Sequence, residues 1–93
     1  MIERDGNTAR VSGALTLETV VALRGAADEL LTAGDVELDL KAVTEVDSSA
    51  LSLLLEWRRA ALHRNVHIRY RNLPPNLTSL ATLYGVNEII SGD

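Results

Sequence analysis

The alternation of strand-like and helix-like stretches is the feature that most constrains how this chain can fold. Residues 36–40 and 66–70 alternate apolar and polar side chains, which is typical of strands with one buried face. Residues 16–34 and 49–63 instead place apolar side chains three or four apart, which predicts amphipathic helices. Each of these helices leads into one of the strands. A helix that links successive strands favours parallel pairing, so the sequence predicts an α/β fold.

The first half of the chain carries clear signals for element ends. Residues 2–4 and 9–13 are expected to be two short strands, because Asp-Gly at positions 5 and 6 is a strong hairpin signal. Thr16 is the expected N-cap of the first helix, and Gly34 is its expected C-terminal cap.

The second half of the chain is divided in the same way. Residues 41–45 are expected to form a short connection. After Pro74-Pro75 a last helix should end at Gly85, and residues 86–90 should form a final strand or a docking segment. The predicted order is β-β-α-β-α-β-α with a possible closing β, in a mixed sheet within a single domain, residues 1–93.

Composition narrows the class of protein. Hydrophobic residues make up 46% of the chain and Phe is absent, so the core must consist mainly of Leu, Val, Ile and Ala. Without cysteine there are no disulfides and no thiolate metal ligands, which fits a cytoplasmic protein. We expect no secretory signal and no membrane-spanning segment. The net charge of −4 argues against nucleic acid as a partner.

One basic block interrupts this acidic chain. Residues 58–71 contain five Arg and no acidic residue. We interpret the block as a solvated helix end followed by an edge strand, and a patch for an anion or a partner is the alternative.

The candidate functional stretch is the strand-to-helix junction that contains Asp47, Ser48 and Ser49. An acid and two hydroxyls follow an apolar run there and precede the most apolar helical segment, 51–62. A helix start points small polar side chains and free backbone N–H groups at solvent. The simpler interpretation is that Ser48 or Ser49 merely caps the helix.

The remaining acidic and histidine side chains do not indicate a catalytic or metal-binding site. Glu37 and Asp39 share one face of a strand, which is more often a solvated face than a catalytic pair. His63 and His67 have the spacing of zinc ligands, but they straddle a helix-to-strand boundary. No Gly-x-Ser-x-Gly elbow or phosphate-binding glycine loop is present. We therefore predict no catalytic residue, no metal and no cofactor.

The helix over residues 49–63 has a wider apolar arc than one buried stripe requires. Either it packs deeply between neighbours, or Leu53 and Trp57 form part of an interface with a partner. Arg58 falls inside the apolar arc, where its aliphatic stem can lie along the core.

The strand at 36–40, followed by Val46-Asp47-Ser48-Ser49-Ala50-Leu51, resembles the signature of STAS domains, the family of anti-sigma factor antagonists. There, Asp-Ser-Ser-Gly-Leu opens a long helix, and Ala50 stands here in place of the usual Gly. The resemblance covers nearly the whole chain and implies the SpoIIAA-like fold. In the antagonist branch it also implies phosphorylation of Ser48 by a partner kinase.

A second, narrower resemblance comes from residues 77–86, Leu-Thr-Ser-Leu-Ala-Thr-Leu-Tyr-Gly-Val. They are similar to the last helix of the MlaB branch of STAS domains, a cytoplasmic subunit of a phospholipid-transport ABC complex. That resemblance implies docking on the ATPase subunit through Ser48, with Asp47, Ser49, Ala50 and Leu51 around it. It also implies contact with the inner membrane only through the complex.

Overall fold

The computed structural model describes residues 2–31 and 34–91. Within them, a four-stranded sheet has the order β1-β2-β3-β4, which is also the order of the strands in the chain. The strands are β1 (Ile2–Asp5), β2 (Thr8–Leu15), β3 (Val36–Val46) and β4 (Ile68–Arg71). β1 pairs with β2 antiparallel, and β2–β3 and β3–β4 are parallel. The predicted hairpin and mixed sheet are therefore confirmed.

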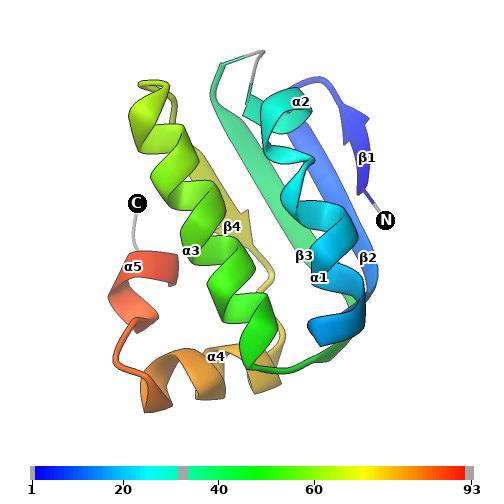
Figure 1. Ribbon diagram of the computed structural model, residues 1–93, viewed down its shortest axis with the longest axis vertical. Coiled ribbons are helices and arrows are strands. Elements are labelled where there is room, and N and C mark those ends of the chain that lie inside the picture. The colour runs from blue at the N-terminus through cyan, green and yellow to red at the C-terminus, as the bar shows by residue number, and fades with distance from the viewer. Residues whose placement is uncertain (1, 32–33, 92–93) are drawn as a thin grey trace.

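Five helices complete the described part of the chain. They are α1 (Leu17–Arg24), α2 (Ala27–Leu31), α3 (Ser48–His63), α4 (Pro75–Leu83) and α5 (Asn87–Ser91). α1, α2 and α3 lie over one face of the sheet, and α4 and α5 flank α3 on the side away from α1 (Figure 1). The fold is thus two layers, helices on a sheet.

The core lies between these two layers. β2 and β3 bury alternate side chains, including Ala9, Val11, Leu38 and Leu40 at 0% exposure. The intervening side chains of the strands face solvent on the uncovered side of the sheet. Among the residues described, the buried side chains are aliphatic or aromatic and none is charged.

The helix predicted over 16–34 is broken. Thr16 is its N-cap, as predicted, but α1 ends at Arg24 and α2 begins at Ala27. The N–H of Gly25 bonds the carbonyl of Leu23, which closes α1 early. Glycine in a helix interior is unfavourable by about 1 kcal/mol relative to Ala. Ending the helix at Gly25 therefore costs little free energy. Residues 32 and 33, just before the predicted cap Gly34, lie outside the described residues, as do 1, 92 and 93 of the predicted domain.

Three further boundaries differ from the prediction. Residues 41–45 are not a connection but part of β3, because β2 is long enough to pair with them as far as Leu15↔Val46. β4 starts at Ile68 and not at residue 66, because the N–H of Val66 bonds the carbonyl of Ala61 and closes α3. Residues 86–90 do not form a strand: α5 occupies this region and buries Ile90.

Candidate functional site

The junction between β3 and α3 is held by one carboxylate. Asp47 is the N-cap of α3, and its Oδ1 accepts the N–H of Ser49 at 2.8 Å. Its Oδ2 accepts the N–H of Leu17, the first residue of α1, at 3.1 Å. The idea that Ser48 or Ser49 caps the helix is therefore wrong, and both hydroxyls are left out of the capping role.

The same hydrogen bonds affect the acidity of Asp47. The N–H of Leu17, and then that of Ser49, hold the pKa of this carboxyl below its usual range, because both stabilise the ionised form. Asp47 thus carries a negative charge that joins the first turns of two helices.

The structure separates the predicted site residues into two groups. Ser48 is exposed and Ser49 is half-buried, and both line a groove together with Leu51. Ala50 and Leu51 are 0% and 4% exposed and belong to the core, although Leu51 also lines the groove. The small side chain of Ala50 permits close packing in the first turn of α3.

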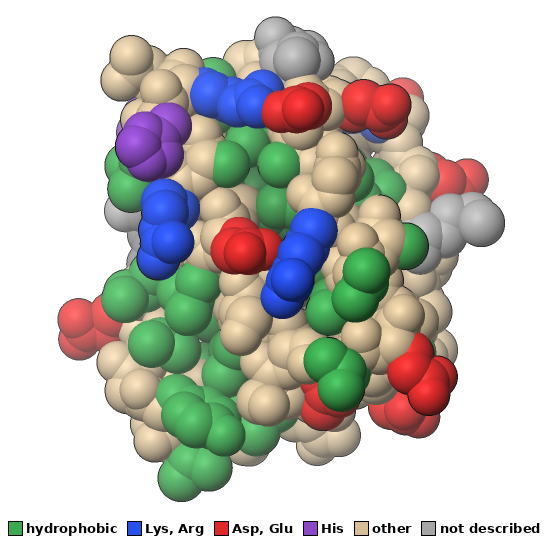
Figure 2. All heavy atoms as spheres, viewed as in Figure 1, with side chains coloured by type: hydrophobic (Ala, Val, Ile, Leu, Met, Phe, Trp, Pro, Cys, Tyr) green, Lys and Arg blue, Asp and Glu red, His purple; other side chains and the backbone are tan. Residues whose placement is uncertain are grey.

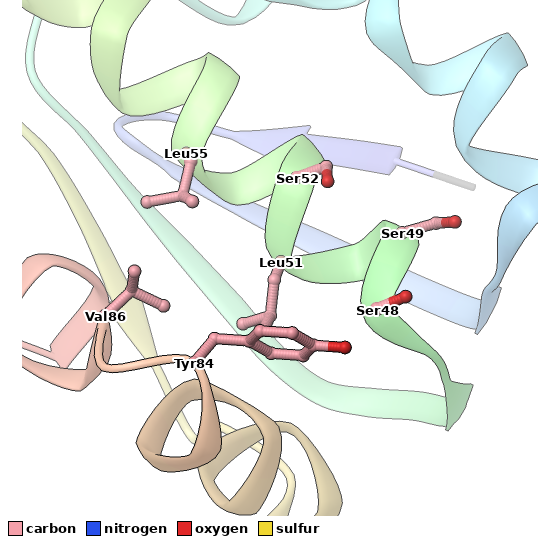
Figure 3. A pocket seen from close by; sticks show the side chains of 7 residues that line it. All are labelled: Ser48, Ser49, Leu51, Ser52, Leu55, Tyr84 and Val86. Carbon is pink, nitrogen blue, oxygen red and sulfur yellow. The ribbon is translucent and has the colours of Figure 1, made fainter.

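The groove has a volume of about 370 Å³ and lies between the first turns of α3 and the end of α4. Its lining is completed by Ser52, Leu55, Tyr84 and Val86. Figure 3 shows the Tyr84 ring extending past Leu51 toward Ser48, whereas the hydroxyls of Ser49 and Ser52 point away from the ring. The groove therefore has an apolar wall and a hydroxyl-bearing edge, and no charged residue lines it.

Tyr84 and Val86 were not among the predicted site residues. Tyr84 follows the last residue of α4 and is 59% exposed, so its side chain belongs to the surface. Gly85, with φ of +72°, ends the helix directly after Tyr84 and turns the chain so that Val86 reaches the groove. In the sequence, a Tyr followed by the helix-ending Gly85 was the feature that could have indicated an exposed aromatic side chain at the end of this helix.

Exposed apolar side chains flank the junction on both sides. Leu17 and Val21 on α1 are 67% and 65% exposed, and Leu83 at the end of α4 is 76% exposed. In Figure 2 apolar side chains gather at the lower left, over α4, with a smaller group at the lower right, over α1. Exposed apolar groups beside a polar edge are typical of surfaces that bind other proteins.

Leu53 and Trp57 belong to the core and not to this surface. Each is 1% exposed, so the interpretation that they form an accessible interface is wrong in this structure. α3 packs against α1 on one side and α4 and α5 on the other, which explains its wide apolar arc. Arg58 lies with its guanidinium 5.5 Å from the centre of the Tyr70 ring, a cation–π distance.

The two histidines lie on different elements. His63 is the last residue of α3, and His67 precedes β4. Within residues 2–31 and 34–91, no three potential ligand side chains come close enough to hold a metal ion. Glu37 and Asp39 lie on β3, where Glu37 pairs with Arg71 at 2.9 Å and Asp39 accepts from Asn72 at 2.9 Å.

This fold and this junction define a STAS domain. The chain belongs to that family, because the family model described as "Mlab, STAS domain" matches residues 2–91. No curated protein matches the sequence at a significant level.

Solved structures with the same fold include SpoIIAA, described as an anti-sigma factor antagonist. Its unphosphorylated form has a TM-score of 0.67 and 17% identity, over 89% of this chain and 81% of that one. The phosphorylated form, described as a Bacillus cell fate determinant, has a TM-score of 0.70 and 17% identity, over 97% and 86%. Mglu has a TM-score of 0.63 and 22% identity over 81% of this chain, which spans 20% of Mglu. At these identities the likeness establishes the fold alone.

None of the described helices combines the length and the apolar character that crossing a bilayer requires.

Proposed function

We propose that this STAS domain is a non-catalytic interaction module, an MlaB-like subunit that binds and supports the ATPase of a phospholipid-transport ABC complex. Such a complex maintains the lipid asymmetry of the outer membrane, and the subunit would work at the inner face of the inner membrane. The observation that carries the proposal is the groove beside Ser48, with an apolar wall from Leu51, Leu55 and Tyr84.

The chemistry of the groove suits a protein surface better than a reaction. Nucleophilic serine needs an adjacent base and a site for an oxyanion. No His, Asp, Glu or Lys lines the groove. The adjacent Asp47 carboxylate already accepts the N–H groups of Leu17 and Ser49, so no free base is placed to activate the Ser48 hydroxyl. A hydroxyl beside apolar walls can instead form one directional hydrogen bond within a largely apolar contact.

Copurification with the ATPase subunit tests this proposal. Wild-type protein should form a stable complex and raise the rate of ATP hydrolysis, whereas Ser48→Glu should lose the complex. The added carboxylate would lie next to Asp47 and would bring charge and bulk into the contact. Ser79→Glu provides the matched control, because Ser79 is exposed on α4 but does not line the groove.

Urea unfolding of both variants must show that the fold persists. If Ser48→Glu is folded and binds the ATPase as wild type does, Ser48 is not in the interface and the proposal fails at this residue.

The second candidate is an anti-sigma factor antagonist that is switched by phosphorylation of Ser48. Its support is the exposure of Ser48 in the first turn of α3, where a kinase can reach the hydroxyl. Phosphate would add up to about −2 of charge at a helix start that tolerates anions, but beside Asp47 and the docking surface. Mass spectrometry after incubation with a cognate kinase and ATP separates the two candidates, since stoichiometric phosphate on Ser48 favours the switch.

A further inference from the structure

A second hollow, separate from the groove at Ser48, lies between the break of the first helix and the outer face of α3. It has a volume of about 340 Å³. Arg24 and Ala27 line it from the α1–α2 side, and Glu56, Trp57, Arg59 and His63 line it from α3. Two ion pairs link the same helices, Arg24–Glu56 at 3.4 Å and Arg64–Asp28. The upper half of the face in Figure 2 carries the corresponding mixture of basic, acidic and apolar side chains.

The indole of Trp57 is the unusual group of this hollow. The side chain is 1% exposed, and its Nε1–H has no hydrogen-bond acceptor among the described residues. A buried donor left without an acceptor costs about 1–3 kcal/mol, so native proteins rarely retain one without a reason. An acceptor that enters the hollow would remove this cost.

The basic side chains of the hollow define what that acceptor is. Arg59 and His63 lie one turn apart on the exposed face of α3, and neither forms an ion pair within the residues described. Arginine donates in pairs to planar or tetrahedral oxyanions, and His donates at least one N–H in either protonation state. Ala27 and Ala60 have short side chains and leave room for an apolar group beside them.

We propose that this hollow binds a small organic oxyanion, a phosphate ester or carboxylate that carries a compact apolar group. Arg59 and His63 hold the anionic group. Nε1 is out of contact with solvent. Arg24 and Glu56 line the same hollow as Trp57, so in this proposal the ligand reaches Nε1 when these two side chains separate. That pair has 53% and 49% of its side chains exposed and therefore contributes little to stability. The ligand oxyanion then replaces Glu56 as the partner of Arg24. This site is independent of partner docking at Ser48.

The single Trp gives the test a direct readout. The ¹H–¹⁵N spectrum of the labelled protein contains one indole resonance, from Nε1 of Trp57. Titration with phenyl phosphate should move it downfield in a saturable way, as expected for a new hydrogen bond. Inorganic phosphate, which has no apolar group, should bind more weakly. Sodium chloride at equal ionic strength should not move the resonance.

A matched pair of variants locates the site. Arg59→Gln should weaken phenyl phosphate binding by about tenfold, which corresponds to the loss of a charge-assisted hydrogen bond. Arg69→Gln removes the same charge from β4 and should leave the affinity unchanged. The proposal is overturned if the indole resonance shows no saturable shift, or if the two variants weaken binding equally.

Discussion

At the scale of single residues, Asp47 has the largest structural role in the site. One carboxylate accepts an N–H from the first turn of α3 and another from the first turn of α1. Those N–H groups have no partner within their own helices, so an acceptor must come from elsewhere. Asp47 therefore fixes the position of Ser48 relative to Leu17, and with it the shape of the proposed docking surface.

Replacement of Asp47 by Asn should lower the urea midpoint at pH 7. Asn keeps one carbonyl oxygen to cap α3 but offers an NH₂ group where the second acceptor was. The pKa of Asp47 in the folded protein lies below its value of about 3.9 in the unfolded chain. Ionised Asp47 therefore stabilises the folded protein fully above about pH 3.9, and this contribution is lost as the pH falls through the folded-state pKa. The difference between wild type and variant should therefore narrow below about pH 4.

Glu45→Gln is the control for this measurement, because it removes a neighbouring exposed carboxylate that accepts no hydrogen bond among the described residues. A difference between wild type and Asp47→Asn that is as large at pH 3 as at pH 7 would show that the charge of Asp47 does not matter.

Tyr70 contributes a buried hydrogen bond. Its hydroxyl donates to the carbonyl of Leu54 in the middle of α3 at 2.5 Å, and burial raises its pKa. Tyr70→Phe should lower the free energy of unfolding by about 1 kcal/mol, since it deletes the bond without leaving a cavity. Tyr84→Phe removes an exposed hydroxyl and should leave stability unchanged, with both values taken from urea denaturation. Equal losses in the two variants would rule out this role.

At the scale of elements, the break between α1 and α2 is the clearest departure from the helical pattern. The apolar spacing continues through it, because Val20, Leu30 and Leu31 are all buried. Gly25 has φ of −71° and ψ of −9°, which any residue can adopt. The backbone at the break therefore does not require glycine at position 25.

Gly25→Ala should raise the free energy of unfolding by about 0.4–1 kcal/mol, because it restricts the unfolded chain at a position where a methyl group meets no atom. Gly85→Ala adds the same methyl group into equally open space, but at φ of +72°. It should lower stability by about 1–2 kcal/mol. Thermal unfolding of the pair isolates backbone conformation from packing, and a gain in both variants would contradict this explanation.

The sequence predicted the fold well, and three of the residues that it singled out, Ser48, Ser49 and Leu51, line the groove. Local signals placed the hairpin at Gly6, the start of α1 at Thr16, the start of α4 at the two prolines and the start of α3 within one residue. The length of β3 was missed because residues 41–46 are strand only through pairing with β2, which is a tertiary contact. Tyr84 was missed for the same reason, since it lies 36 residues from Ser48 in sequence and meets it only in the folded protein.

At the scale of the whole molecule, the two faces differ in character. The uncovered face of the sheet places opposite charges side by side, with Glu3 opposite Arg10, Arg10 opposite Asp39 and Asp39 opposite Arg71. These charges compensate one another within the protein. The helix face instead leaves apolar side chains exposed around Ser48. A partner therefore gains more from the helix face.

Tyr84→Ala should weaken binding to the ATPase subunit by about 30-fold or more, which is the loss of roughly 2 kcal/mol typical of an aromatic residue at the centre of an interface. Arg10→Ala, on the uncovered face of the sheet, should change the affinity by less than about twofold. Calorimetric titration of each variant measures both. If Arg10→Ala weakens binding as much as Tyr84→Ala does, the partner uses the sheet face.

The strand order β1-β2-β3-β4 also bears on how the protein is made. Each strand adds to the edge left by the one before it, so the sheet can grow in the direction of synthesis. Tyr84 and Val86 follow all four strands in the chain, which means that the groove gains its apolar wall only after the sheet exists. During synthesis, Ser48 would therefore be exposed before the groove that binds a partner is complete. In pulse-labelled hydrogen exchange during refolding, amides of β2 and β3 should become protected before those of α4.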